Sequence, residues 1–372
     1  MPSLLRSFKK RKRISEAKTL TRTPNEKAID TTKPSAVFQP TKGREWTVSI
    51  ALPGSVIANA QSHDQKTSLA GHIARALSVF CIDEIVIFSD GNTPDKAIKR
   101  HSKQPPVPDQ QIELTRNDYT GNSDPNHFLA HLLSYLETPP YLRKELFPLH
   151  QNLRTAGTLP SLDLPHHLKS HEWCQYREGI TLDGSNEFKT FVEAGLRVPV
   201  TVEEQIPPKT RVTLKFRSGA KEANDDPTSE VIFADPVNPY EPRENGGYYW
   251  GFHIRRAARL SDVFTECTFN GGYDLTIGTS ERGSNIEALF SEEESLNGSF
   301  NHLLIVFGGV AGLELAVKND EEFQRLGVFE AKDIFDRWIN ICPGQGSRTI
   351  RTEEALWIGL AGLKRLFHQE EH

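Results

Sequence analysis

The last hundred residues contain three short apolar runs that each lead into a loop rich in glycine. The runs and their loops are Tyr273–Ile277 with Gly278–Gly283, His302–Phe307 with Gly308–Glu314, and Trp338–Cys342 with Pro343–Thr349. Glycine lets backbone amides approach a ligand closely, and open α/β sheets bind ligands at the carboxyl ends of their strands. The three loops therefore predict a pocket for a ligand about the size of adenosine.

Other chemistries fit the sequence less well. It contains neither G-x-x-x-x-G-K-[ST] nor G-x-S-x-G, which disfavours a P-loop ATPase and an α/β-hydrolase. The second glycine loop faintly resembles a dinucleotide fingerprint, but it comes too late in the chain to leave room for a dinucleotide domain. His166, His167 and His171 have no cysteine nearby to complete a zinc site, so we expect no metal.

The elements that must position the loops begin near residue 44. Trp46–Leu52 alternates like a strand, and Glu84–Phe88 is a continuous apolar run typical of a buried strand. Between them, Ser62 and Gln65 form a capping box before residues at helical spacing. Ser123–Pro125 supplies the cap and first-turn proline of a second helix. This strand–helix–strand pattern predicts a parallel sheet.

The pattern changes to short strands with period two between residues 166 and 264, separated by Gly, Pro, Asn and Asp. The predicted strands are Gly179–Leu182, Phe188–Glu193, Arg197–Val202, Arg211–Phe216, Glu230–Phe233 and Tyr248–Ile254. Five or six such strands favour a small barrel or sandwich, and we predict an OB-like barrel. The α/β domain would then be discontinuous, with residues 41–165 and 265–372 on either side of the insertion.

One strand of the insertion carries alternating basic residues that we predict to contact RNA. They are Lys209, Arg211, Lys215 and Arg217, and they alternate with apolar residues. Such a strand presents either a solvated basic face or an oligonucleotide-binding face of the barrel. In the second case Tyr248, Tyr249, Trp250 or Phe252 could stack on bases.

The charge distribution also bears on nucleic acid. The chain has 372 residues and a net charge of −5, yet its first 35 residues hold ten Lys and Arg against three acids, a local excess of +7. With few large apolar residues, residues 1–40 are predicted to be a disordered basic tail. This tail is either a solvated segment, a nuclear address or an arm that grips RNA.

The four cysteines lie far apart, and no stretch is apolar enough to span a membrane.

Four longer motifs resemble the SPOUT superfamily of RNA methyltransferases, in the branch with a mid-chain OB-like insertion. The motifs are VSIALPGSVIANAQ (48–61), YDLTIGTSERGS (273–284), IVFGGVAGLE (305–314) and NICPGQGSRTIRTEEA (340–355). The resemblance covers roughly residues 44–372. It implies an α/β fold with a trefoil knot, S-adenosylmethionine bound in the knot, a homodimer, and RNA bound near the dimer interface. It also makes Ser55, Asn59 and Gln61 candidates for the active-site rim or a dimer contact, unless they only cap the turn.

Mapped onto this sequence, the resemblance implies which residues hold the cofactor. They are Thr279, Gly308, Gly309, Gly312, Leu313, Asn340, Ile341, Cys342, Gly344, Gln345, Gly346, Ser347, Thr349, Ile350 and Thr352. Methylation of a base nitrogen requires loss of its proton, for which Glu281 is a candidate base or orienting residue. Arg282 and Arg351 are candidates to stabilise the base anion, and Arg348 to grip RNA phosphate. Glu353 is interpreted as an acid that stabilises the start of the last helix.

The sequence thus predicts an S-adenosylmethionine-dependent RNA methyltransferase that modifies a base, with uridine as the candidate, in ribosomal RNA in the nucleus or nucleolus. Two alternatives stay open at this point. One is an RNA-binding ribosome-assembly factor that keeps the fold with little or no catalysis. The other is a dinucleotide oxidoreductase, which would bind nicotinamide instead.

Overall fold

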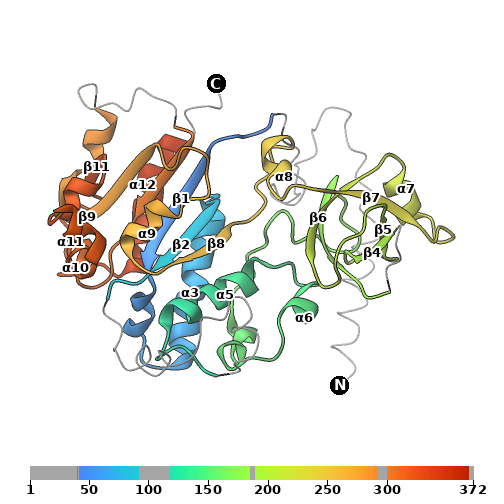
Figure 1. Cartoon of the computed structure of the whole chain (residues 1–372), viewed down its shortest axis with the longest axis horizontal. Coiled ribbons are helices and arrows are strands. Elements are labelled where there is room, and N and C mark those ends of the chain that lie inside the picture. Colours follow the sequence, from blue (N-terminus) through green and yellow to red (C-terminus); the bar gives the residue numbers. More distant parts are fainter. Residues whose placement is uncertain (1–39, 41, 92–117, 185–188, 292–299, 368–372) are drawn as a thin grey trace, which may run out of the picture.

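The computed structural model describes residues 40, 42–91, 118–184, 189–291 and 300–367. The basic block of the predicted tail therefore lies outside the described residues. Figure 1 shows a parallel sheet with helices on both faces, and a separate small barrel beside it.

The sheet has six strands in the order β11-β9-β10-β1-β2-β8, and neighbouring strands pair in parallel. Its strands are β1 (Thr47–Pro53), β2 (Glu84–Phe88), β8 (His253–Ala257), β9 (Leu275–Asn285), β10 (His302–Val306) and β11 (Arg337–Asn340). The central strands are continuous apolar runs because both faces of the sheet are covered. After β1 the chain forms β2, which lies next to β1 on one side, whereas β10 and β9 lie on the other side of β1. The strand order therefore reverses between β1 and β10.

Two sets of helices cover the two faces of the sheet. Alternate β1 residues divide between two cores, with Ile50 in the first and Ala51 in the second. The first core is covered by α3 (His63–Val79), α5 (Pro125–Glu137) and α12 (Thr352–Phe367). The second is covered by α9 (Leu260–Thr265), α10 (Gly312–Asn319) and α11 (Glu321–Leu326). The shorter helices are η1 (Gly54–Asn59), α6 (Arg143–Leu146), η3 (Gln151–Leu153), η4 (Ala156–Thr158), α7 (Ala220–Asp225), α8 (Glu241–Glu244), η5 (Ile286–Phe290) and η6 (Ala331–Ile334).

Helix starts follow the predicted local signals. The Ser62–Gln65 capping box is formed in both directions at the start of α3. The Asp124 side chain accepts a hydrogen bond from the His127 amide at the start of α5, with Pro125 as the first helical residue. Both signals are local, which explains why the sequence alone locates these helices.

The barrel is closed and has the strand order β3-β4-β5-β7-β6. Its strands are β3 (Tyr176–Thr181), β4 (Thr190–Glu193), β5 (Val200–Val202), β6 (Arg211–Phe216) and β7 (Ile232–Val237). A separate cluster of buried aliphatic side chains, including Val192, Leu214 and Ile232, fills it. Closure leaves the barrel no free sheet edge.

One predicted barrel strand belongs to the other sheet. The run Tyr248–Ile254 is not a sixth strand of the insertion. Instead the chain pairs in parallel with β2 from His253 to Ala257, as strand β8. The return to the α/β sheet thus comes before the predicted boundary at residue 264. Tyr249 and Phe252, predicted for base stacking, pack against the core of the α/β part, and Phe252 is buried there.

The first glycine loop also differs from its prediction. Strand β9 continues to Asn285, and consecutive residues of β11, Trp338 and Ile339, pair with Gly278 and Ser284. Residues 279–283 are therefore the extra residues of a bulge within a paired strand, rather than a loop that follows one.

Candidate functional site

The three glycine-rich segments meet at the carboxyl edge of the sheet and are joined by hydrogen bonds to backbone carbonyls. The Thr279 hydroxyl donates to the Val306 carbonyl at 3.0 Å, and the Thr352 hydroxyl donates to the Gly308 carbonyl at 3.0 Å. The Asn340 side chain donates from Nδ2 to the carbonyl of Glu281 at 2.9 Å. The predicted loops, which lie far apart in sequence, therefore form one site.

The second loop, residues 308–312, is a tight turn with glycine at three of its five positions. Gly312 has φ +75°, and its amide donates to the Gly309 carbonyl at 3.0 Å. A Cβ on Gly308 would lie 2.9 Å from the Gly312 carbonyl carbon, and one on Gly309 would lie 3.2 Å from Asp90 Oδ2. The Ser55 hydroxyl donates to that same Asp90 oxygen at 2.5 Å. The turn after β10 thus packs against the ends of β1 and β2, next to the β1–β10 boundary where the strand order reverses and where ligands bind in such sheets.

The third loop, residues 341–351, leaves an open face. Its glycines, Gly344 and Gly346, are exposed, and a Cβ on either would meet nothing within 4 Å. The Cys342 amide donates to Asn340 Oδ1 at 3.0 Å and anchors the start of the loop. The remaining predicted cofactor residues lie along this segment or at the start of α10, namely Ile341, Gln345, Ser347, Thr349, Ile350 and Leu313.

The predicted catalytic side chains lie at the rim of this site. Glu281 and Arg282 are exposed on the β9 bulge, and Arg282 Nη1 lies 3.4 Å from Glu314 Oε1. Arg351, also exposed, precedes the first residue of α12, and its amide donates to Glu354 Oε2 at 3.0 Å. The contact that stabilises the helix start is therefore made by Glu354.

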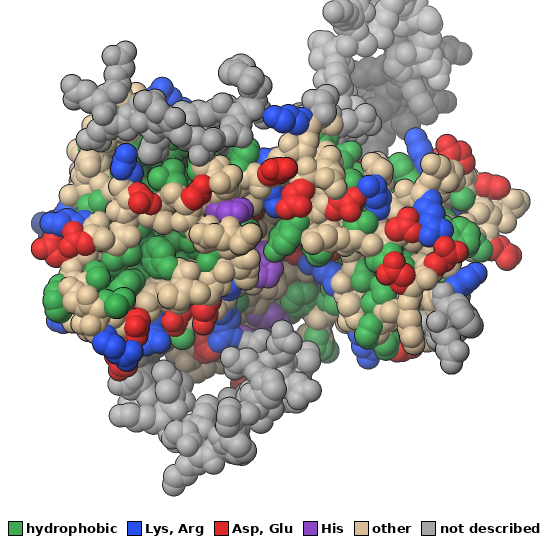
Figure 2. All heavy atoms as spheres, turned by 45° about the horizontal axis from the view of Figure 1, so that its top comes forward, with side chains coloured by type: hydrophobic (Ala, Val, Ile, Leu, Met, Phe, Trp, Pro, Cys, Tyr) green, Lys and Arg blue, Asp and Glu red, His purple; other side chains and the backbone are tan. Residues whose placement is uncertain are grey.

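The predicted RNA-contacting residues of the barrel are paired with acids, apart from Lys209, which is exposed at the turn before β6. Lys215 Nζ lies 2.6 Å from Glu241 Oε1, and Arg217 contacts both Asp235 and Glu203. Figure 2 shows acidic and basic side chains interspersed over this part of the surface. The strand therefore does not present a purely basic face. Arg348 is exposed on the third loop, which belongs to the α/β part.

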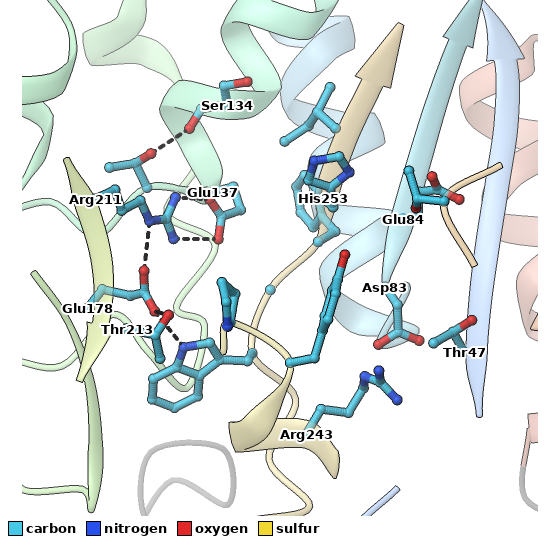
Figure 3. A pocket seen from close by; sticks show the side chains of 18 of the residues that line it. Thr47, Asp83, Glu84, Ser134, Glu137, Glu178, Arg211, Thr213, Arg243 and His253 are labelled. Carbon is cyan, nitrogen blue, oxygen red and sulfur yellow. Dashed lines mark hydrogen bonds and ion pairs between the residues drawn. The ribbon is translucent and has the colours of Figure 1, made fainter. Parts of the chain in front are cut away.

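Arg211 has an architectural position that sequence reasoning missed. Its guanidinium lies 2.7 Å from Glu137 Oε2 at the end of α5 and 2.7 Å from Glu178 Oε2 on β3. Trp250 Nε1 donates to Glu178 Oε1 at 2.8 Å. These contacts join the barrel to the α/β part beside a cavity of about 660 Å³ (Figure 3). The one sequence signal for this junction is the acid Glu137 at the end of an apolar helix.

The electrostatics of this junction follow from the pairing. Burial alone would raise the pKa of Glu137, but Arg211 and His166 outweigh burial and hold that pKa well below its usual range. Burial would lower the pKa of Arg211, yet its two carboxylate partners raise it. Both groups therefore remain charged while the protein is folded.

The predicted histidine cluster is also part of this junction. His166 and His167 each place Nε2 within 3.0 Å of the Glu137 carbonyl oxygen. Within the described ranges, no group of three or more His, Cys, Asp or Glu is arranged to hold a metal ion. No helix among those residues is long and apolar enough to cross a membrane.

A parallel sheet with glycine turns at its strand-order reversal defines a class of proteins that bind a nucleoside-like ligand there. Comparison with known families narrows this class. The family model described as "Putative RNA methyltransferase" matches residues 47–363. The chain belongs to this RNA methyltransferase family and is a methyltransferase.

Three relatives carry the same name, "28S rRNA (uridine-N(3))-methyltransferase". The Homo sapiens protein is 40% identical over 328 residues, which cover 87% of this chain and 79% of that protein. The Mus musculus protein is 40% identical, with 87% and 77% covered. The Drosophila melanogaster protein is 41% identical, with 86% and 62% covered. The matches extend over both the α/β part and the barrel.

Proposed function

We propose that this protein transfers a methyl group from S-adenosylmethionine to N3 of a uridine in the ribosomal RNA of the large subunit. The observation that carries this proposal is the joining of three glycine-rich segments at one edge of the sheet. The uridine and the ribosomal RNA come from the names of the relatives.

The residues at this edge fit an S-adenosylmethionine molecule. The open face around Gly344 and Gly346 leaves room for a ligand, and the glycines of the turn at Gly308–Gly312 carry no side chain that would keep a ligand away from the backbone. Thr279, Asn340 and Thr352 hold these segments in place. When bound, the cofactor supplies the activated methyl group, so the protein has to position the acceptor and exclude water.

The finer fold assignment is also a proposal. We place the chain in the SPOUT superfamily and propose that the segment between β11 and α12 threads the trefoil knot of that fold. The hydrogen bond from Thr352 to the Gly308 carbonyl supports this proposal, because it joins the start of α12 to the turn after β10. We also propose a homodimer that buries Val79, Trp357 and Ile358, which are exposed on α3 and α12. Light scattering that gave a 41.9 kDa species would contradict the dimer.

RNA would bind across the barrel and the rim arginines. A closed five-stranded barrel in the order found here is the architecture of many oligonucleotide-binding domains. Arg282, Arg348 and Arg351 are exposed at the rim, where they can reach phosphate or a base anion, and Glu281 beside them can orient the base. We further propose that the protein acts in ribosome assembly in the nucleolus, with the basic residues of segment 1–40 as the address.

Calorimetry with S-adenosylhomocysteine tests the cofactor site. We expect the wild type to bind and Gly309→Trp to bind at least about 100-fold more weakly, because its ring must displace the neighbouring Ser55–Asp90 pair or fill the site. Gly157→Trp is the matched control, because a Cβ there meets nothing within 4 Å. Absence of binding by a folded wild type would overturn the cofactor proposal.

Mapping N3-methyluridine in large-subunit RNA after deletion of the gene tests the reaction. Loss of one specific mark, restored by the wild type and not by Gly309→Trp, is the expected result. Defective ribosomal particles with every mark present would instead favour the assembly-factor alternative.

A further inference from the structure

One buried carboxylate oxygen beside the glycine segments has no partner. Glu353 lies in the first turn of α12 with its side chain 12% exposed, and its Oε2 is buried without a hydrogen bond. Within the described ranges it is the one carboxylate oxygen in this state. A buried acceptor left unpaired is destabilising, and such exceptions indicate either a bound water or ion or a functional role.

The position of Glu353 is fixed by its neighbours in α12. The preceding residue, Thr352, bonds the Gly308 carbonyl. Two turns further on, Gly359 lets the helix pack closely on Phe307 and Ile341, since a Cβ there would lie 3.1 Å and 3.4 Å from their side chains. The first turns of α12 therefore lie against the ends of β10 and β11, where the second and third glycine segments begin.

The other acids near this edge are exposed or already engaged. Glu354 Oε2 accepts the Arg351 amide. Asp90 Oδ2 accepts the Ser55 hydroxyl, and Glu314 pairs with Arg282. Glu281 is exposed on the β9 bulge. Because Glu354 already makes the capping contact, stabilising the helix start does not explain why Glu353 Oε2 is buried.

We infer that Glu353 Oε2 accepts the N3 proton of the target uridine, an inference that rests on the proposed function. At neutral pH the uracil N3 carries a hydrogen and must lose it to act as a nucleophile. The N3–H bond breaks and its proton passes to Oε2. N3 forms a bond to the methyl carbon, and the carbon–sulfur bond of the donor breaks to leave a neutral thioether. The Arg351 guanidinium lies 3.9 Å from the other oxygen, Oε1, so Oε2 is left to meet the base.

The test compares Glu353→Gln with Glu354→Gln, which removes the same charge one residue away. We expect Glu353→Gln to lower the single-turnover methylation rate by on the order of 100-fold or more. Its rate should recover as pH rises and solvent removes the proton. In the presence of S-adenosylhomocysteine, the wild type should bind uridine RNA about tenfold more tightly than N3-methyluridine RNA, and Glu353→Ala, which removes the acceptor, should lose this preference. Glu354→Gln should keep the rate, the pH profile and the preference.

Several outcomes overturn the inference. One is a Glu353→Gln rate within about threefold of the wild type. Another is a loss of S-adenosylhomocysteine affinity as large as the loss of rate, which would make Glu353 a cofactor ligand. Thermal unfolding of both variants separates misfolding from chemistry, and Glu353→Asp should restore part of the rate if the carboxylate is required. A wild type that binds no cofactor or methylates no uridine would instead refute the proposed function.

Discussion

The two edges of the central sheet differ in how their charged side chains are partnered. At the amino edge, where the barrel joins the sheet, Asp83 is paired with Arg44, Glu84 with Arg255, and Glu137 and Glu178 with Arg211 (the cavity in Figure 3). At the carboxyl edge, glycine turns and exposed backbone dominate, and Glu353 Oε2 has no partner. Paired buried charges fix the relative position of the two parts of the chain, whereas the unpartnered Oε2 of Glu353 is where we infer that the target base binds.

The largest expected effect comes from breaking the junction. Arg211→Ala should destabilise the protein by about 3 kcal/mol, because it leaves Glu137 and Glu178 buried without their cation. Urea denaturation measures this loss, and calorimetry should find the affinity for S-adenosylhomocysteine unchanged. Lys221→Ala, on an exposed residue of α7, is the control. If Arg211→Ala abolished cofactor binding in a protein that is still folded, cofactor binding at the carboxyl edge would depend on the junction at the amino edge.

These two edges also differ in what the sequence could predict. The glycine segments and the caps of α3 and α5 depend on neighbouring residues, so their motifs are visible in the chain itself. The junction depends on Arg211 meeting an acid 74 residues away, and nothing local to Arg211 distinguishes a paired arginine from one that binds RNA. Strand β8 was misassigned for the same reason. Its alternating pattern resembles that of a barrel strand, and only its pairing with β2 shows that it belongs to the parallel sheet.

The function that we infer for Glu353 could not be predicted from the sequence, because a general rule about acids at helix starts already accounts for this residue. Acids in the first turn of a helix are expected to stabilise it, and Glu353 and Glu354 both fit that expectation. Only the contacts separate them, because Glu354 caps the helix while Glu353 Oε2 is buried and unpaired.

A second, smaller effect concerns pH. Burial, together with His150 and His127, lowers the pKa of His131 to about 3. The unfolded chain binds that proton near pH 6.5, so stability is lost progressively as pH falls from about 6.5 toward 3. His131→Phe, which keeps a ring stacked on Phe147, should therefore lose less stability between pH 7.5 and pH 5, by about 1–2 kcal/mol.

Urea denaturation at the two pH values checks this difference, with His72→Phe on an exposed part of α3 as the control. The titration of Glu137 does not contribute to the loss of stability between pH 7.5 and pH 5. Its lowered pKa means that its contribution is present above about pH 4.3 and is lost only as pH falls below that value. An equal pH dependence for His131→Phe and the wild type would show that the His131 ring already takes up a proton in the folded state.

The smallest expected effect concerns Arg217, which lies just after strand β6, in comparison with Arg211 on that strand. Arg217 lies six residues after Arg211 and contacts Asp235 and Glu203, but all three side chains are substantially exposed. Exposed pairs contribute little to stability, so Arg217→Ala should leave the urea midpoint unchanged. If Arg217 exchanges its acids for RNA phosphate, Arg217→Ala should reduce the salt dependence of RNA binding. The slope of the logarithm of the binding constant against the logarithm of the salt concentration should become about one unit less steep. Arg211→Ala, measured under conditions where it is folded, should leave that slope unchanged, because its guanidinium is held by Glu137 and Glu178. An unchanged slope for Arg217→Ala would remove this arginine from the RNA surface.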